Sequence, residues 1–343
     1  MITVQKEGKI LEKTNHPFET HGVLNPAVIK QGEDVHLFYR AVGQGNRSTI
    51  GYCRLDGPTR VAERWDRPFM VPEIEFEALG MEDPRIVKID KLYYLSYTGF
   101  DGINARAALA ISEDLIHFRK VGILAPPITY ADFVSGTKTD VNISGRYLRN
   151  QTSYIQQPAP GKTLMLWDKD VVFFPKKING QLVFLHRIRP GIQIVRINSL
   201  KQLTKEFWDD YFLHLEEYVI MEPLYDHESS YIGSGCPPIE TPYGWLLIYH
   251  GADKTENGIE YSACAAALLD LENPAKIVSR LPYALFKPEY MWEKRGEVNN
   301  VVFPTGTALF GDTLYIYYGA AGESIAVASL SLSELLNELV SQW

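Results

Sequence analysis

A turn signal leads directly into a strand-like run at Tyr243-Gly244-Trp245-Leu246-Leu247-Ile248-Tyr249-His250. Glycine permits the tight turn, and the aromatic and β-branched residues that follow it favour an extended strand. The same order of turn and strand occurs five times along the chain, the other copies being Gly32 to Arg40, Asp90 to Tyr97, Asn179 to His186 and Gly311 to Tyr318. This repetition indicates one structural unit that is used five times.

Further short apolar runs flank these copies. Ala27 to Ile29 and Arg85 to Val87 precede the first two copies, while Ala107 to Ile111 and Ile325 to Ser329 follow the second and the fifth. Each unit is therefore predicted to be an antiparallel meander. Repeated units of roughly 40 to 50 residues are typical of a propeller, because each blade buries its faces against its neighbours. A generic all-β protein with tyrosine-rich hairpins is the alternative, and the matching order of the copies favours the propeller.

We therefore predict the all-β fold class and, within it, a five-bladed β-propeller with minor peripheral helices, formed as a single domain by residues 1–343. Apolar residues at helical spacing predict one helix between Ser199 and Leu215, and Ser333 is expected to cap another at the C-terminus. The insertion named below is expected to border a site or to contact another subunit. The expected segments are blade cores near 27–55, 84–118, 169–198, 237–270 and 302–330, an insertion near 125–168 and a C-terminal helix over 333–343.

Composition excludes several classes of function. The 34 Lys and Arg residues against 42 Asp and Glu residues give a net charge of -8, which is the wrong sign for a surface that neutralises nucleic-acid phosphates. Cys53, Cys236 and Cys264 lie too far apart in sequence for a disulfide framework or a Cys-x-x-Cys metal knuckle. No signal-peptide core and no run of ~20 apolar residues is found. We expect a cytoplasmic protein with no metal, no nucleic-acid partner and no membrane partner.

Polar residues stand at the ends of the expected inner strands. A propeller directs these ends toward a central pocket, so they are the candidates for a functional site. One arginine or histidine in such a place is ordinarily a structural residue, but several at equivalent strand ends indicate a binding site. The candidates are Asn25, Arg40, Glu82, Asp83, Arg85, Lys169, Asp170, His186, Arg187, Arg189 and His250.

The segment Glu82-Asp83-Pro84-Arg85 is the most distinctive of these features. Pro84 biases Asp83 toward an extended backbone, so a carboxylate and a guanidinium are expected near a blade entrance, although a tight turn would also explain the segment. An aromatic-rich pocket with fixed Asn, Asp and Arg groups suits a sugar. Cleavage of a glycosidic bond then requires a general acid for the leaving oxygen and a nucleophile on the opposite face of the ring.

Seven segments in this order closely resemble glycoside hydrolase family 130, and the resemblance extends from roughly Gly22 to Leu330. The family has a five-bladed β-propeller fold. Most members are inverting phosphorylases that cleave β-mannosides with inorganic phosphate to give mannose 1-phosphate, and a minority are β-mannosidases that use water. The segments are Asn25-Pro26 with Tyr39-Arg40, Glu82 to Ile86, Phe174-Pro175 with Ile178 to Gly180, His186-Arg187, Gly235 to Ile239, Gly244 to Gly251 and Tyr315 to Ala321.

The resemblance implies roles for ten residues. Asp83 would be the proton donor, acting through a sugar hydroxyl. Inorganic phosphate would be the co-substrate, with no other cofactor. The implied substrate-binding residues are Asn25, Arg40, Glu82, Arg85 and Tyr261, and the implied phosphate-binding residues are Lys169, Arg187, Tyr231 and His250. Lys169 replaces a frequent Arg, Tyr231 replaces a frequent Lys, and Gly322 stands where the family usually has an acid.

The choice between phosphorolysis and hydrolysis depends on charge. Phosphate is already a nucleophile and needs cations, which Lys169, Arg187, Arg189 and His250 are expected to supply. Water needs a carboxylate base, for which Glu228, Glu297 and Glu323 are available. We therefore predict an inverting phosphorylase for β-1,2- or β-1,4-linked mannosides, with a manno-oligosaccharide or mannosyl disaccharide as substrate and a homo-oligomer as a possible assembly. A β-mannosidase is the alternative, and a non-catalytic sugar-binding propeller is disfavoured by the intact segment at Asp83.

Overall fold

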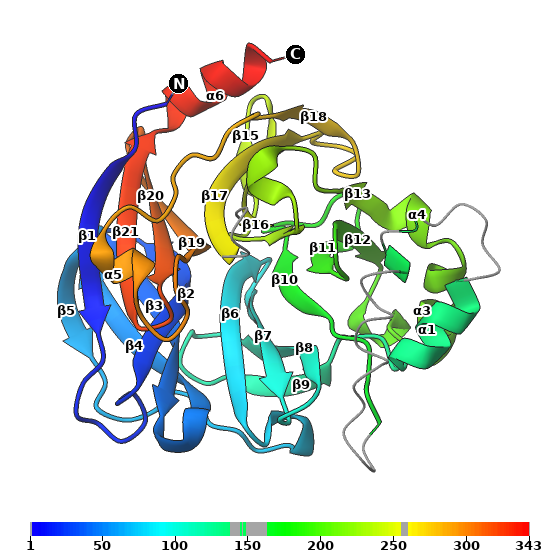
Figure 1. The fold of residues 1–343 in the computed structure, drawn as a ribbon, viewed down its shortest axis with the longest axis horizontal. Helices are drawn as coiled ribbons and strands as arrows, with labels where there is room; N and C mark the ends of the chain where they lie inside the picture. The colour runs from blue at the N-terminus through cyan, green and yellow to red at the C-terminus, as the bar shows by residue number, and fades with distance from the viewer. Residues whose placement is uncertain (1, 138–144, 146, 149–162, 255–259, 343) are drawn as a thin grey trace.

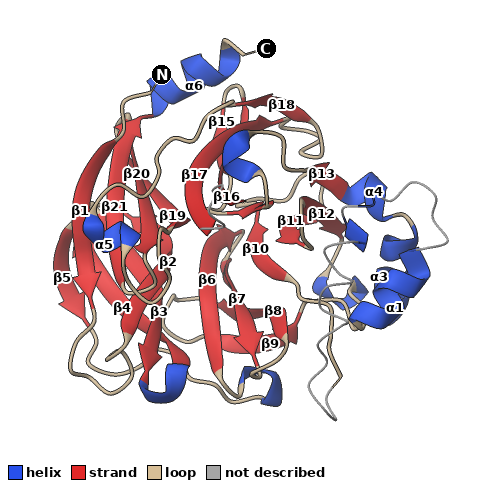
Figure 2. Ribbon diagram, viewed as in Figure 1, coloured by secondary structure: helices blue, strands red, loops and turns tan. Residues whose placement is uncertain are grey.

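The computed structural model describes residues 2–137, 145, 147–148, 163–254 and 260–342, and strands predominate in them (Figures 1 and 2). The strands form four sheets. Three of the sheets contain one meander each, and the fourth, which has eight strands, contains two meanders. No sheet in the described part of the chain closes on itself. The all-β fold class is confirmed.

No described helix is both long enough and apolar enough to cross a membrane.

The eight-stranded sheet consists of two antiparallel meanders. They are joined only by a parallel bridge between Ser48 and Gly80, so each meander is a separate unit of pairing. The first meander contains β2 (Gly22–Gln31), β3 (Asp34–Gly43), β4 (Arg47–Asp56) and β5 (Arg60–Arg64). The second contains β6 (Gly80–Ile89), β7 (Leu92–Phe100), β8 (Ala105–Ser112) and β9 (Arg119–Ile123).

The other three sheets contain one meander each. The third meander contains β10 (Lys169–Phe173), β11 (Leu182–Arg187), β12 (Ile192–Ile197) and β13 (Val219–Met221). The fourth contains β14 (Tyr231–Ser234), β15 (Ile239–Thr241), β16 (Gly244–Lys254), β17 (Glu260–Leu269) and β18 (Ile277–Arg280). The fifth contains β19 (Val302–Phe310), β20 (Thr313–Ala320), β21 (Ser324–Ser331) and the N-terminal β1 (Gln5–Glu12).

The N-terminal strand completes the last sheet. β1 pairs with β21 in antiparallel register, so segments from the two ends of the chain lie side by side (Figure 1). The five turn-and-strand copies found in the sequence form β3, β7, β11, β16 and β20, and each of them pairs with a strand on both sides. The repeat in the sequence is therefore a repeat in the strand pairing.

Buried apolar side chains gather into five clusters, one between each pair of successive meanders. Burying one Leu or Phe side chain contributes about 1.5–3 kcal/mol, so each cluster holds two neighbouring meanders together. The cluster members include Phe38 with Leu95, Leu109 with Phe173, Leu185 with Leu247, Ile248 with Ile316, and Tyr317 with Leu37. The last pair joins the fifth meander to the first, so the packing returns to its starting point.

The helices lie outside the meanders (Figure 2). Half of the expected insertion lies outside the described residues. The prediction that Ser333 caps the last helix is wrong, because Ser331 accepts the hydrogen bond from Glu334 while the Ser333 hydroxyl bonds Asp312. The α-helices are α1 (Tyr130–Thr137), α3 (Lys205–Leu213), α4 (Leu215–Tyr218), α5 (Met291–Lys294) and α6 (Leu332–Val340), and the 3-10 helices are η1 (Gln44–Asn46), η2 (Glu75–Glu77), η3 (Leu200–Gln202) and η4 (Asp226–Glu228).

A buried carboxylate supports each meander. In four meanders it accepts a hydrogen bond from a tyrosine hydroxyl of the second strand and pairs with a cation, and in the third a histidine takes the place of the tyrosine. The carboxylate contacts are Tyr39 to Glu19 at 2.8 Å, Tyr97 to Glu77 at 2.6 Å, His186 to Asp168 at 3.0 Å, Tyr249 to Glu228 at 2.5 Å and Tyr318 to Glu293 at 2.8 Å. The paired cations are Arg64, Lys120, Arg280 and Lys6. These carboxylates are structural because their acceptor positions are already used.

Glu228 is the member of this set that sequence analysis offers as a catalytic base. It is fully buried and bonds Arg280 at 2.5 Å and the backbone N–H of Leu224 at 2.9 Å. Burial raises its pKa, but the contacts with His227, Arg280 and Tyr249 outweigh burial and lower the pKa to about 2. A carboxylate held in this way is a poor proton acceptor at neutral pH.

The contacts of Glu228 with Tyr249 and Arg280 give a test of the fold. Because its folded pKa of about 2 lies below the ordinary value of 4.5, its charge stabilises the protein above pH 4.5, and this stabilisation is lost as the pH falls toward 2. Glu228→Gln is therefore expected to lower the free energy of unfolding at neutral pH by about 3 kcal/mol, and by less in acid. Urea unfolding at pH 7 and pH 3 measures both values. Glu297→Gln, at an exposed position, is the control, and equal midpoints for Glu228→Gln and wild type at pH 7 would contradict the assignment.

Candidate active site

A bulge interrupts the first strand of three meanders at the same place. The pairing register shifts between Leu24 and Ala27, between Glu82 and Arg85, and between Lys169 and Val172. A bulge turns a side chain away from the regular alternation of a strand. The residues inside the three bulges are Asn25, Asp83 and Asp170, with φ angles of 51°, 49° and 56°. Asn and Asp adopt this left-handed conformation more readily than other non-glycine residues.

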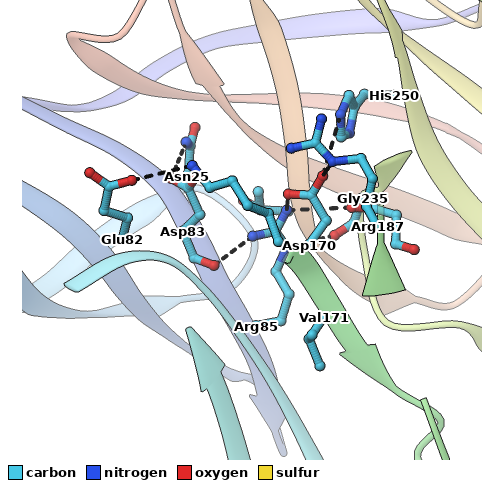
Figure 3. Close-up of polar contacts among 12 residues, drawn as sticks. Asn25, Glu82, Asp83, Arg85, Asp170, Val171, Arg187, Gly235 and His250 are labelled. Atoms are coloured by element: carbon cyan, nitrogen blue, oxygen red, sulfur yellow. Dashed lines mark hydrogen bonds and ion pairs between the residues drawn. The ribbon is translucent and has the colours of Figure 1, made fainter. Parts of the chain in front are cut away.

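The backbone at Asp83 corrects a prediction. Sequence analysis expects an extended conformation before Pro84, but the φ angle of 49° is left-handed. The local bias is overridden by tertiary contacts, because the Arg85 Nη1 donates to the Asp83 carbonyl oxygen at 2.6 Å and its Nε donates to the Gly235 carbonyl oxygen at 2.8 Å (Figure 3). Arg85 is 1% exposed, so these bonds fix the bulge of the second meander to the fourth.

The three bulges face one cavity of about 220 Å³, which all five meanders line. Glu82, Arg85 and His250 are buried and lie behind its wall. The side chain of Tyr261 lies outside the described part of the structure. The backbone of Tyr261, in β17, pairs with Asp253 of β16. The residues predicted from the sequence that line the cavity are Asn25, Arg40, Asp83, Lys169, Asp170, Arg187, Arg189 and Tyr231.

Asp83 on the cavity wall and Glu82 behind it make one side of the site acidic (Figure 3). Asn25 Nδ2 donates to Asp83 Oδ1 at 2.6 Å. Arg40 Nη2 lies 2.7 Å from Glu82 Oε1, and its Nη1 lies 3.9 Å from Asp83 Oδ1. Lys169 Nζ lies 3.4 Å from Glu82 Oε2 and 3.9 Å from Asp83 Oδ2. Each carboxylate therefore contacts both cations.

These contacts set the charge of Asp83. Burial raises its pKa, but Lys169, Arg40 and Arg85, together with the Asn25 hydrogen bond, outweigh burial and lower the pKa to about 2. The side chain is thus ionised at neutral pH when the cavity holds no anion. A proton donor needs a higher pKa, so a bound group must offset these cations before Asp83 can donate.

Asp170 organises the opposite, cationic side. Its Oδ2 lies 2.7 Å from Arg187 Nε and 3.7 Å from His250 Nε2, and its Oδ1 lies 3.6 Å from Arg85 Nη2 (Figure 3). The guanidinium groups of Arg187 and Arg189 lie 4.8 Å and 3.8 Å from the centre of the Tyr231 ring. Tyr231 therefore holds two cations against the cavity by cation–π contacts.

The prediction that His250 is a cation is wrong. Burial lowers its pKa, Arg187, Arg85 and Arg189 lower it further, and Asp170 only partly opposes them, so the pKa is about 3. The ring is 0% exposed, and its centre lies 4.3 Å from that of Phe303. His250 is therefore a neutral group behind the wall, and the cations of the wall are Arg40, Lys169, Arg187 and Arg189.

Sequence analysis missed other residues of the wall. Tyr130, Trp167 and Phe303 add aromatic surface to it. Asp170, which sequence analysis names among the strand-end candidates without assigning it a role, is the second carboxylate of the wall after Asp83. Tyr130 and Trp167 lie in or beside the expected insertion, where no periodic pattern exists to locate them. Within the described residues, no group of three or more His, Cys, Asp or Glu side chains could hold a metal ion.

Comparison with known proteins places the chain in a family. A family model of glycoside hydrolase family 130, described as beta-1,4-mannooligosaccharide phosphorylase, matches residues 3–341. The chain belongs to glycoside hydrolase family 130. Among its family 130 relatives is the 1,2-beta-oligomannan phosphorylase of Thermoanaerobacter sp. (strain X514), which is 35% identical over 338 residues and 95% of each chain. The Beta-1,2-mannobiose phosphorylase of the same organism is 34% identical over 91% of each chain.

Solved family 130 structures share the fold. The Beta-1,2-Mannobiose phosphorylase from Listeria innocua, in complex with beta-1,2-mannobiose, has a TM-score of 0.71 at 22% identity, covering 99% of this chain and 100% of that one. Another structure, described under "The GH130 family of mannoside phosphorylases contains glycoside hydrolases that target beta-1,2 mannosidic linkages in Candida mannan", has a TM-score of 0.67 at 21% identity, covering 96% and 93%. At this identity the likeness shows the fold alone.

Gly322 departs from the acid that the family 130 resemblance implies at this position. Its φ angle is 74°, and an added Cβ would lie 3.3 Å from Glu297 Cβ and from Val298 N. A side chain here would be both strained and crowded. The neighbouring Glu323 pairs with Lys13 at 3.6 Å and does not line the cavity, and neither does Glu297. The local backbone is therefore adapted to glycine.

The Tyr231 contacts predict how the family 130 cavity binds an anion. Tyr231→Ala removes the ring that supports Arg187 and Arg189, and each cation–π contact contributes roughly 0.5–2 kcal/mol, so sulfate should bind about tenfold more weakly. Isothermal titration calorimetry with sulfate measures the affinity. Tyr231→Phe retains the ring and is the control, expected to bind sulfate as wild type does. Wild-type affinity in Tyr231→Ala would contradict this role for the ring.

Proposed function

We propose that this family 130 enzyme is an inverting β-mannoside phosphorylase. It cleaves a β-1,2- or β-1,4-mannosyl linkage with inorganic phosphate and releases mannose 1-phosphate. The observation that carries the proposal is one cavity with a carboxylate, Asp83, and its neighbour Lys169 on one side and the cations Arg187 and Arg189 on the other. An inverting displacement needs its acid and its nucleophile on opposite faces of the sugar ring.

The relatives support this substrate class. Among those that match over 90% of the chain are a 1,2-beta-oligomannan phosphorylase and a Beta-1,2-mannobiose phosphorylase. The Beta-1,4-mannooligosaccharide phosphorylase of Ruminococcus albus is 32% identical over 179 residues, about half of each chain. A manno-oligosaccharide or mannobiose is therefore the proposed substrate, and the β-1,2 linkage has the better support because its relatives cover more of this chain.

In the proposed mechanism, Asp83 is the proton donor and phosphate binds against Lys169, Arg187 and Tyr231. Phosphate carries its own negative charge and attacks the anomeric carbon directly, so no general base is required. The glycosidic C–O bond breaks, the leaving oxygen takes a proton that originates from Asp83, and the new C–O bond joins mannose to phosphate. Asn25 and Arg40, which contact Asp83 or Glu82, hold the donor and the mannose ring.

The bound phosphate also makes Asp83 a better acid. Lys169 is the cation that lowers the pKa of Asp83 the most. A dianion bound against Lys169 offsets that charge, and the pKa of Asp83 then rises toward the range of a proton donor. Glu82 and Arg85 act from behind the wall, Glu82 by holding Arg40 and Arg85 by holding the bulge. His250 is a neutral neighbour of Asp170 and Phe303 in this scheme.

Hydrolysis is the second candidate because family 130 contains both activities, as the description of one solved structure states. A hydrolase needs a second carboxylate as base. Among the described residues of the wall, Asp170 is the one carboxylate besides Asp83, and the pKa of Asp170 is lowered because Arg187, His250, Arg85 and Lys169 outweigh the effect of burial. A carboxylate held by these groups is a weak base, which favours phosphate over water.

The proposal includes the architecture. We infer that the five meanders are the blades of one five-bladed β-propeller, and that the whole chain is one catalytic domain. The five interblade clusters, the pairing of β1 with β21 and the family match over residues 3–341 support this. The cavity then lies where the first strands of the blades meet, as in other propellers. Phosphate as co-substrate is the only small molecule that the chemistry requires besides the mannoside.

Phosphorolysis is tested by product analysis. The protein is incubated with β-1,2-mannobiose or β-1,4-mannobiose, with and without phosphate, and mannose 1-phosphate and free mannose are quantified. Mannose 1-phosphate is expected only with phosphate, and with β-1,2-mannobiose as the better substrate. Equal release of mannose with and without phosphate, and no mannose 1-phosphate, would identify a hydrolase instead.

The proposed donor is tested by Asp83→Asn. Loss of the acid is expected to lower kcat by at least about a hundredfold, because general acid catalysis contributes 10²–10⁴-fold. The amide can still interact with Arg40 and Asn25, so the thermal midpoint should stay close to that of wild type. Asp114→Asn, which replaces a surface aspartate, is the matched control. Retained activity in a folded Asp83→Asn variant removes Asp83 from the mechanism.

A further inference from the structure

Asp170 has a position in the fold that its sequence context does not explain. It lies in the bulge of β10, has a φ angle of 56°, and is 2% exposed. Asn25 and Asp83 occupy the equivalent bulges of β2 and β6 and contact each other. Asp170 instead pairs with Arg187 and Arg85, so the same kind of bulge places a side chain on a different side of the cavity.

The contacts of Asp170 come from three different meanders. Arg187 on β11 lies 2.7 Å from its carboxylate, Arg85 on β6 lies 3.6 Å from it, and His250 on β16 lies 3.7 Å from it. Gly233 on a further strand, β14, has no side chain and so leaves space for the Asp170 carboxylate and the His250 ring. An added Cβ on Gly233 of β14 would lie 2.4 Å from Asp170 Oδ2 and 2.5 Å from His250 Cε1. The carboxylate is therefore enclosed, and its position is fixed from several directions.

We propose that Asp170 is the positioning residue of the phosphate site, where its carboxylate holds Arg187 in the cavity wall in the geometry that receives the anion. The inference rests on the proposed phosphorylase function. Two buried guanidinium groups, those of Arg85 and Arg187, both pair with the Asp170 carboxylate, whose negative charge offsets the repulsion between them. Asp170 also pairs with Arg85 at 3.6 Å, and Arg85 Nη1 donates a hydrogen bond to the Asp83 carbonyl oxygen, so both sides of the cavity share one support.

Charge alone predicts the opposite effect from positioning. A carboxylate close to a phosphate site repels the phosphate, so removing its charge should strengthen anion binding if Asp170 has no other role. If Asp170 positions Arg187, removing its charge weakens anion binding although the site becomes more positive. The sign of the change in anion affinity therefore separates the two roles.

The test uses Asp170→Asn in the full-length protein, with sulfate and inorganic phosphate as probes. We expect the dissociation constant for sulfate, measured by calorimetry, to rise about tenfold, and the KM for phosphate to rise while the KM for the mannoside changes less than about twofold. Glu323→Gln changes the net charge by the same amount outside the cavity wall and is the control, expected to bind sulfate as wild type does. Unchanged or tighter sulfate binding by Asp170→Asn overturns the proposal.

A double-mutant cycle identifies the partner through which Asp170 acts. If Asp170 acts by holding Arg187, the double variant with Arg187→Ala binds sulfate no more weakly than Arg187→Ala alone. Independent, additive losses in the two single variants would overturn the proposal.

A second variant keeps the test decisive if Asp170→Asn does not fold. Gly233→Ala leaves every charge in place but displaces the Asp170 carboxylate, and it should weaken sulfate binding to a similar degree. Wild-type sulfate affinity in a folded Gly233→Ala variant counts against positioning. Sulfate binding does not require turnover, so the two proposals fail in different measurements. This inference fails if the variants bind sulfate as wild type does, whereas the proposed phosphorylase function fails if the wild-type enzyme forms no mannose 1-phosphate.

Discussion

The geometry of the site depends on one backbone feature, a left-handed residue inside a bulge of the first strand of a meander. A regular strand would direct alternate side chains into the packed interfaces between meanders. The bulge changes this direction once, at the same place in three meanders, and brings Asn25, Asp83 and Asp170 to one cavity. Such a conformation costs energy for a non-glycine residue and persists because the surroundings enforce it. At Asp83 and Asp170 the enforcing group is Arg85, which contacts both residues.

The buried carboxylates divide into two kinds according to their partners. Those that support the meanders, such as Glu77, Glu228 and Glu293, each accept a tyrosine hydroxyl, pair with a cation and bond backbone N–H groups. Asp83 and Asp170 contact cations and side chains at the cavity, where a ligand can compete for the same cations. A buried carboxylate is therefore a candidate for chemistry only where its partners face a cavity, a distinction that composition and spacing do not reveal.

The sequence predicts the strands well and the site in part. The turn-and-strand repeat locates the second strand of every meander, because turn chemistry and aromatic propensity are local properties. The repeat also leads to Asn25, Arg40, Asp83, Lys169, Asp170, Arg187 and Arg189, and the family resemblance adds Tyr231; all of these line the cavity. The charge of His250 was predicted wrongly because it depends on groups distant in sequence, such as Arg85. The backbone of Asp83 was predicted wrongly because Arg85, which bonds its carbonyl oxygen, is itself held by Gly235 of the fourth meander. Ser331 is the cap in place of Ser333 because the helix begins at Leu332, and Asp312 binds the hydroxyl groups of both serines.

Two requirements conflict inside the cavity, and the proposed co-substrate reconciles them. An anion site needs cations, whereas a proton donor needs a pKa near the working pH. Lys169 lies within 3.9 Å of Asp83, and with the other cations it keeps the pKa of Asp83 at about 2 while no anion is bound. Phosphate brings negative charge to these cations and so permits Asp83 to hold a proton. Water brings no charge and leaves Asp83 ionised. In the proposed mechanism, the electrostatics that would bind phosphate therefore make the acid available only when the phosphate nucleophile is in place. The protein's net charge of -8 gives no sign of such a site.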